Sequence, residues 1–124
     1  MQTKARAKLH GVVMSKIRYF HNEKLAIATI FKKDIEQAGA KDGDTEGFID
    51  FVMGIDTVEV GVCLMEMEKN KFHVSLRAKS VNVNEVALLF GGGGHILASG
   101  CRISGEYEEI VDKLQYVIGV RIPE

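Results

Sequence analysis

Hydrophobic and polar residues follow patterns along this chain that predict both helices and strands. Four apolar residues recur with the spacing of an amphipathic helix, which is expected from about Thr3 to His21: Leu9, Val13, Ile17 and Phe20. A continuous apolar run from Lys24 to Phe31 has the length of a central strand that is covered on both faces. Between Val58 and Leu76, apolar and polar residues alternate on both sides of a polar turn, which predicts a β-hairpin.

The remaining segments predict further helices and one more strand. Helices are expected at Asp34–Ala40, Glu46–Met53, Asn82–Phe90 and from Glu106 onwards, and a short strand at Cys101–Ser104. Thr45 can cap the second of these helices, and Asn82 with Glu85 resembles a capping box for the third. The order α, β, α, α, β, β, α, β, α predicts the α/β class: a single layered domain with a mixed β-sheet and helices packed on its faces.

The composition is that of an ordinary globular protein. The chain has 124 residues, 46% hydrophobic and 27% charged, which suits one domain. Its net charge of −1 argues against a protein that coats nucleic acid by bulk charge. No apolar run approaches the roughly 20 residues of a membrane span, and no signal core follows the basic N-terminus. We therefore expect no membrane partner and a cytoplasmic location, with Cys63 and Cys101 as small buried hydrophobes.

The most unusual stretch is the run of four glycines Gly91–Gly94, closed by His95. The residues His95–Ser99 are expected to form the first turn of a helix, whose unpaired N–H groups and positive dipole end favour an anion. The run lies in the segment Lys69–Gly105, where five Lys and Arg residues face a single acid, Glu85. The pattern predicts a site for one small anionic group, and the alternative is a flexible turn. The candidate binding residues in this stretch are Gly92, Gly93, Gly94 and His95.

Arg77 and Ser80 precede the glycine run by one short predicted helix. Arg77 ends the polar face of its strand and can make two parallel hydrogen bonds to a phosphate, while Ser80 can add a hydroxyl. A single helical connection can return the chain beside the strand that it left, so we expect both residues to lie near the glycines. The structural alternatives are a solvated strand-end charge for Arg77 and a capping or surface role for His95.

Groups for catalysis cannot be assembled from the sequence. The four histidines are isolated, with no His-x-His or His-x-x-x-His spacing, and no Gly-x-Ser-x-Gly elbow occurs. The glycine run differs from a Walker loop, because His95 and Ile96 stand where that motif has Lys and Ser or Thr. We therefore expect no catalytic residue and no metal site in this chain, and a role in recognition instead.

Two stretches carry a family resemblance: Phe90–Cys101, which contains the Gly-Gly-Gly-His-x-x-Ala-x-Gly pattern, and Val74–Ser80. They closely resemble the DHHA1 domain of the DHH phosphoesterase superfamily, and most of all its oligoribonuclease and 3′-phosphoadenosine-5′-phosphate phosphatase branch. Asp44–Gly47 adds weaker support, and the resemblance covers Lys24 to Arg121. Ser99 departs mildly from the pattern, since many relatives have alanine there.

The resemblance implies a division of labour between two domains. In that family an N-terminal DHH domain holds two manganese ions and hydrolyses the substrate, and the DHHA1 domain binds the substrate across a cleft. This chain has no Asp-His-His motif. The resemblance therefore implies a substrate-binding half, with residues 23–124 as the DHHA1-like domain and residues 1–22 as the end of an interdomain connection. Its partners would be a short RNA or DNA oligonucleotide or a phosphorylated nucleotide, and a DHH domain that carries Mn²⁺.

Other functions remain open at this point. Within the superfamily, the same glycine motif fits a cyclic-dinucleotide phosphodiesterase, a single-strand exonuclease, an exopolyphosphatase-related protein or the tail domain of alanyl-tRNA synthetase. Outside it, the chain could be a stand-alone nucleic-acid-binding module without catalysis. A third alternative is a dimerisation domain, because the hairpin predicted within Val58–Leu76 could pair through a strand edge to form a homodimer.

Overall fold

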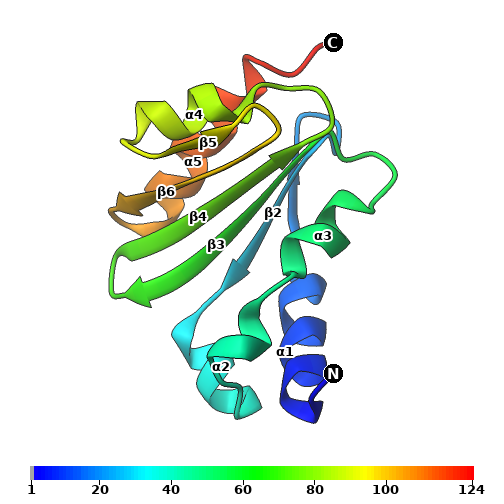
Figure 1. Ribbon diagram of the computed structural model, residues 1–124, viewed down its shortest axis with the longest axis vertical. Coiled ribbons are helices and arrows are strands. Elements are labelled where there is room, and N and C mark those ends of the chain that lie inside the picture. Colours follow the sequence, from blue (N-terminus) through cyan, green and yellow to red (C-terminus); the bar gives the residue numbers. More distant parts are fainter. Residues whose placement is uncertain (1) are drawn as a thin grey trace.

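Helices cover both faces of a mixed six-stranded sheet in the computed structural model, which describes residues 2–124 (Figure 1). The helical elements are α1 (Lys4–Ser15), α2 (Lys32–Ala38), the 3-10 turn η1 (Asp42–Thr45), α3 (Phe48–Met53), α4 (Val83–Leu89) and α5 (Tyr107–Gly119). The strands are β1 (Arg18–Phe20), β2 (Leu25–Ile30), β3 (Val60–Glu68), β4 (Lys71–Ala78), β5 (Gly93–His95) and β6 (Ala98–Ser104). Figure 1 shows α1, α2 and α3 on one side of the strands and α4 and α5 on the other. The predicted α/β class with a layered, mixed sheet is confirmed.

The strands lie in the order β1–β2–β3–β4–β6–β5. Only the β2–β3 pair of this sheet is parallel, and the other neighbours are antiparallel. A parallel pair needs a crossover connection, which α2, η1 and α3 supply on one face of the sheet. The hairpin that the alternating pattern predicts is formed by β3 and β4, with Glu68 paired to Lys71 across the turn. Asn70 in that turn has a φ of 61°, a conformation that asparagine tolerates well.

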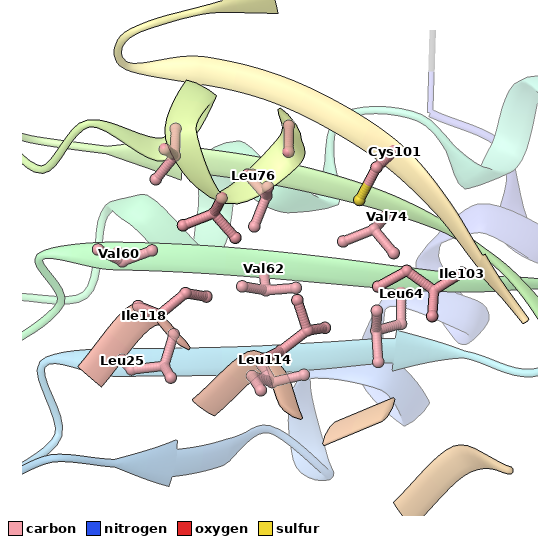
Figure 2. Packing of buried hydrophobic residues seen from close by; sticks show 14 of the residues in the cluster. Leu25, Val60, Val62, Leu64, Val74, Leu76, Cys101, Ile103, Leu114 and Ile118 are labelled. Carbon is pink, nitrogen blue, oxygen red and sulfur yellow. The ribbon is translucent and has the colours of Figure 1, made fainter. Parts of the chain in front are cut away.

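The larger core lies between the sheet and helices α4 and α5 (Figure 2). Strands β2, β3, β4 and β6 each turn alternate side chains into it, and α5 adds Leu114 and Ile118. The strand residues labelled in Figure 2 are Leu25, Val60, Val62, Leu64, Val74, Leu76, Cys101 and Ile103. Since successive side chains of a strand point to opposite faces, the burial of Val74 and Leu76 directs Ser75 and Arg77 to the other face.

A second core fills the space between the opposite face of the sheet and helices α1 and α3. It contains Leu9, Val13, Ala26, Ala28, Ile30, Phe48, Ile49, Val52, Val58 and Cys63. Strand β2 therefore contributes to both cores, and all six of its residues are buried. This arrangement confirms the prediction of a central strand covered on both faces.

The predicted N-terminal helix is shorter than the apolar repeat suggested. Helix α1 ends at Ser15, and the chain then forms β1, which pairs antiparallel with β2. Ile17 packs against the α1–α3 core, whereas Phe20 packs against the α4–α5 core. The two residues therefore lie on opposite faces of the sheet and cannot share one helical stripe. The interdomain role of residues 1–22 stays a prediction, although the buried Leu9 and Val13 make α1 part of this fold.

The predicted helix Glu46–Met53 also begins later than expected. The residues that precede it form η1, and Gly47 takes a left-handed conformation with φ of 82° before α3 starts at Phe48. Thr45 does not cap this helix, because its hydroxyl donates to the carbonyl of Asp42 within η1. The predicted helix is therefore present but starts two residues later, and a 3-10 turn forms in the segment that precedes it.

The predictions for the two C-terminal helices agree with the structure. The side chain of Asn82 accepts a hydrogen bond from the N–H of Glu85 and caps α4. Helix α5 begins directly after Glu106, whose carboxylate accepts from the N–H of Glu108, and it ends at Gly119. These local signals therefore identified the helices that close the larger core.

Candidate functional site: a basic row beside a strand-lined pocket

The glycine run does not open a helix, contrary to the sequence-based prediction. Gly93 to His95 form the edge strand β5, which turns through Ile96 and Leu97 and pairs antiparallel with β6. Strand β6 begins at Ala98, earlier than the expected Cys101. The N–H groups of Gly93–His95 therefore belong to a strand, and no helix dipole contributes at this position.

Two glycines of the run are required by close packing. A Cβ at Gly92 would meet the carbonyl oxygen of Gly100, and would lie 2.6 Å from the Cβ of Cys101. Gly94 has a φ of 150°, and its Cβ would lie 2.7 Å from the carbonyl oxygen of Ala98. By contrast, the nearest atom that a Cβ at Gly93 would meet, apart from its chain neighbours, is Oδ1 of Asn84 at 3.9 Å. Gly92 and Gly94 thus hold β5 against β6, while Gly93 leaves open space.

Arg77 and His95 belong to one row of the sheet. Arg77 on β4 pairs with Ala98 on β6, and Ala98 in turn pairs with His95 on β5. Residues that lie directly opposite each other in antiparallel strands share a face, so the row carries Arg77 and His95 on either side of a methyl group. Two strand spacings of about 4.8 Å separate them, which gives roughly 10 Å between their Cα atoms.

The next row of the sheet has almost no side chains on this face. Ser75 of β4 pairs with Gly100 of β6, which pairs with Gly93 of β5. A ligand can therefore approach the backbone closely between Arg77 and His95. The structure thus brings Arg77, Gly93 and His95 together, as the sequence predicted. The β5–β6 hairpin, and not the start of a helix, places Gly93 and His95 near Arg77.

Arg77 is available to a ligand. Its Nη1 donates to the carbonyl of Leu76 at 3.1 Å, and it forms no ion pair with an acid within residues 2–124. Arg6, Arg18 and Arg121, in contrast, all bind side-chain acceptors. His95 is exposed. A half-buried guanidinium without a carboxylate partner is a strong candidate for an anion ligand.

Ser80 lies apart from this row. It follows the end of β4 in an exposed bend, and the part of the chain that the structure describes gives its hydroxyl no hydrogen bond. Arg77 still stands in the ladder, whereas Lys79, one residue before Ser80, has left it and donates its N–H to the carbonyl of Glu59. Ser80 therefore remains a prediction as a binding residue.

A pocket of about 730 Å³ adjoins Arg77 on the same face of the sheet. Its floor consists of residues of β3 and β4, and its walls come from α2, η1 and the start of α3. The floor residues include Cys63, Met65, His73, Ser75 and Arg77. The sequence did not predict this pocket, because four stretches of the chain form it: α2, residues 42–49, β3 and β4. The alternation of His73, Ser75 and Arg77 opposite the core was the signal that could have indicated its floor.

The wall of the pocket at residues 42–47 is fastened to helix α1. The hydroxyl of Thr3 donates to Oδ1 of Asp44 at 2.6 Å, and Nη2 of Arg6 donates to the carbonyl of Glu46 at 2.7 Å. The guanidinium of Arg6 also lies 5.0 Å from the ring centre of Phe48. Helix α1 thus positions residues 42–47, which form one wall of the pocket.

Two ionisable groups near the pocket have shifted pKa values. The Thr3 hydroxyl and then the N–H of Lys41 donate to the buried carboxylate of Asp44, and these bonds lower its pKa below the ordinary value. Burial raises the pKa of the Cys63 thiol to about 11, so it stays protonated at neutral pH. Asp44 therefore acts as a fixed anion that anchors the wall, and Cys63 as an apolar part of the floor.

The pocket differs in charge from the row of Arg77 and His95. Four carboxylate side chains line it, from Glu36, Asp42, Glu46 and Glu66, against the cations Lys32 and Arg77. A phosphate is therefore favoured at the Arg77 end and disfavoured deeper in the pocket.

Residues 2–124 contain no further candidate site for a metal ion. In that range no cluster of three or more His, Cys, Asp or Glu side chains is arranged to hold a metal ion. None of the helices described there has the length and hydropathy to cross a membrane.

Comparisons with known proteins relate this geometry to one family. A family model described as the DHHA1 domain matches residues 22–119. Among curated proteins, the chain is 32% identical over 114 residues to the probable bifunctional oligoribonuclease and PAP phosphatase NrnA of Streptococcus mutans, covering 90% of this chain and 36% of that protein. It is 28% identical over 114 residues to NrnA of Thermus thermophilus, covering 87% of this chain and 33% of that protein. The chain thus spans about a third of the length of these relatives.

Solved structures show the same fold. An exopolyphosphatase-related protein from Bacteroides fragilis matches with a TM-score of 0.84 and 28% identity, over 94% of this chain and 34% of that one. A pGpG-specific phosphodiesterase from Vibrio cholerae matches with a TM-score of 0.65 over 96% of this chain and 40% of that one, and at 18% identity this likeness concerns the fold alone.

Proposed function

Because this chain belongs to the DHHA1 domain family of the DHH phosphoesterases, we propose that it binds the phosphate of a short oligonucleotide or of a 3′,5′-bisphosphonucleoside. In this proposal the phosphate lies between Arg77 and His95, above the nearly bare backbone of Gly93 and Gly100. The chain presents the substrate, and a DHH domain hydrolyses it.

The observation that carries this proposal is the row formed by Arg77, Ala98 and His95. A guanidinium without an acidic partner can donate two parallel hydrogen bonds to a phosphate. A small residue at the centre of the row lets the phosphate approach both side chains. His95, when it carries a proton on the nitrogen that faces the ligand, adds a donor from the other side.

The adjoining pocket supports a nucleotide rather than a bare phosphate as the ligand. Its volume of about 730 Å³ lies within the usual range of small-molecule sites. Apolar side chains such as Met65 and Met67 can contact the face of a base, and the four carboxylates can accept hydrogen bonds from sugar hydroxyls or base amino groups. The same carboxylates disfavour a phosphate inside the pocket, so the phosphate is favoured at the Arg77 end.

Hydrolysis is assigned to a DHH domain on the same or another polypeptide. The relatives named oligoribonuclease and PAP phosphatase are about two and a half times as long as this chain, which is consistent with a second domain. Mn²⁺ held by that domain would polarise the phosphoryl group and activate water. The present residues would contribute orientation, by holding the phosphate in a fixed position relative to that domain.

The experiment that tests this function is a calorimetric titration of 3′,5′-bisphosphoadenosine into the wild type and into Arg77→Ala, which measures the affinity of each. Loss of a charged, paired hydrogen bond should weaken binding by about 1.5 to 3 kcal/mol, which is roughly tenfold or more. Arg77→Lys should recover only part of the loss, because an ammonium group cannot bind in the same bidentate way. Lys113→Gln on α5 removes an exposed charge away from the row and serves as the control. Equal affinities of the wild type and Arg77→Ala would refute the proposal.

A second function is favoured by one comparison. The exopolyphosphatase-related structure resembles this chain with 28% identity, so a polyphosphate is an alternative ligand of the same row. A competition experiment separates the two ligands, with tripolyphosphate and unlabelled nucleotide each used to displace a labelled nucleotide. Displacement by tripolyphosphate at a lower concentration than by the unlabelled nucleotide would favour the alternative. The apolar side chains of the pocket, such as Met65 and Met67, argue for the nucleotide, since a polyphosphate has no base to contact them.

A further inference from the structure

Strands β4, β5 and β6 present one continuous face without an acidic side chain. On the side away from the α4–α5 core, the alternation of β4 and β6 and their pairing with β5 define what we name the basic face: Lys71, His73, Ser75, Arg77, Gly93, His95, Ala98, Gly100, Arg102 and Ser104. None of these residues is Asp or Glu. The carboxylates of the neighbouring pocket come instead from α2, the 42–47 segment and β3. The two surfaces share His73, Ser75 and Arg77 on β4, so the basic face borders the carboxylates along β4, and its β5 and β6 residues lie on the side of β4 away from β3.

Arg102 lies two rows of the sheet away from Arg77 on this face. It pairs with His73 in the β4–β6 ladder, and the Ser75–Gly100 row separates this pair from the row of Arg77. Arg77 and His73 are four residues apart on one strand, which corresponds to about 13 Å at 3.3 Å per residue. Arg102 is exposed, and within residues 2–124 it forms no ion pair with an acid. The function proposed above does not use it.

Building on the proposed function, we infer that Arg102, supported by His73, is a second phosphate-binding position that selects for longer single-stranded oligonucleotides. A single nucleotide is shorter than about 13 Å, so the phosphate at Arg102 is a different one, further along the strand than the phosphate bound by Arg77. Between the two positions Gly100 leaves the backbone bare, and Ser75 adds only a small hydroxyl. A phosphodiester strand can therefore follow the β6 side of the face, past Gly100 and away from the carboxylates on β3 and the pocket walls.

This inference predicts that Arg102 matters only above a certain substrate length. A mononucleotide or dinucleotide held at Arg77 does not reach Arg102, so its affinity should be unchanged in Arg102→Gln. A strand of four or five nucleotides should lose affinity by roughly fivefold, the upper limit for an exposed ion pair. In the wild type, affinity should rise with length, and in the variant this rise should disappear.

The experiment measures fluorescence anisotropy of 5′-phosphorylated oligoadenylates of two to five nucleotides, labelled at the 3′ end, with the full 124-residue chain. The wild type, Arg102→Gln, Arg77→Ala and the control Lys113→Gln are compared over a series of salt concentrations. For the pentanucleotide, Arg102→Gln should reduce the slope of log affinity against log salt by about 0.7, the value for one phosphate contact to a single strand. For the dinucleotide the slope should not change.

The outcomes separate this inference from the function on which it rests. If the wild type and Arg102→Gln show the same dependence on length and salt while Arg77→Ala loses binding, the second position is wrong and the proposed function stands. If Arg102→Gln weakens the dinucleotide as much as the pentanucleotide, the effect is one of general charge and the second position is also wrong. If Arg77→Ala binds the dinucleotide as the wild type does, the proposed function itself fails.

Discussion

Arg77 and His95 lie in the same row of the sheet because each pairs across the strands with Ala98. The two residues are separated in the sequence by helix α4 and the glycine run. The hairpin of β5 and β6 returns the chain beside β4, and this pairing places two groups that can donate to an anion on either side of a nearly bare backbone. The candidate site is therefore a property of the strand register.

The glycines of the run should differ sharply in their tolerance of substitution. Gly92→Ala introduces a Cβ that collides with the backbone of β6, so it should lower the free energy of unfolding by about 1 to 3 kcal/mol, as overpacking does. Gly93→Ala and Gly93→Val meet open space and should change it by about 0.5 kcal/mol or less. Urea unfolding measures both effects. Equal destabilisation at the two positions would contradict the described contact of β5 with β6.

Gly93→Val should also separate binding from folding. The variant should melt close to the wild type, whereas its affinity for 3′,5′-bisphosphoadenosine should fall by about tenfold or more, because a branched side chain blocks the approach of the phosphate to the backbone. Normal binding by Gly93→Val would show that the ligand does not approach the strand at this point.

The hydroxyl of Thr3 should stabilise the fold through two bonds. It accepts from the N–H of Arg6 at the start of α1 and donates to Asp44 in the pocket wall. Thr3→Val keeps the shape but removes the cap, so we expect a loss of about 1 to 2 kcal/mol in the free energy of unfolding. Thr3→Ser retains the hydroxyl and should lose much less. Thermal melts of the two variants side by side test this, and equal losses would show that the methyl group, not the hydroxyl, is responsible.

Asp44 should make the stability depend on pH at the acidic end. Its pKa in the folded chain is lower than the ordinary value of 3.8, so its contribution is fully present above that pH and is lost as the pH falls through the lower folded value. Asp44→Asn has no such titration. The difference in unfolding free energy between the wild type and this variant should be constant from pH 7 to about 5 and should shrink below about pH 4. A difference that grows on acidification would mean that the carboxylate is destabilised in the fold.

Much of the fold could be predicted from local signals in the sequence. The alternation along β3 and β4, the unbroken apolar run of β2 and the Asn82 cap of α4 are each encoded within a few consecutive residues. The position of Arg77 on the polar face of β4 follows from the same alternation. These predictions hold because a long strand that packs against a core needs an apolar side chain at each position that faces the core, and this requirement leaves a visible pattern in the sequence.

The elements that were predicted wrongly from the sequence are short, and their conformation depends on residues far away in the chain. β1 and β5 have three residues each, too few for a periodic signal, and both exist because a neighbouring strand pairs with them. Ile17 and Phe20 fit a helical repeat but pack in different cores. The pocket wall could not be predicted either, because the hydrogen bonds from Thr3 and Arg6 to residues 44 and 46 join segments that are far apart in the chain.

The most direct measurement of the central claim is a map of the backbone amide signals in ¹H–¹⁵N spectra during titration with 3′,5′-bisphosphoadenosine. The account predicts that the largest shifts occur at Gly93, His95 and Gly100 and at the end of β4, and that Arg77→Ala abolishes them at the same ligand concentration. The amides of α5, on the opposite side of the sheet, should not move. Shifts centred on α4 and α5, or shifts at the β5–β6 hairpin that persist unchanged in Arg77→Ala, would contradict the assignment of the phosphate site.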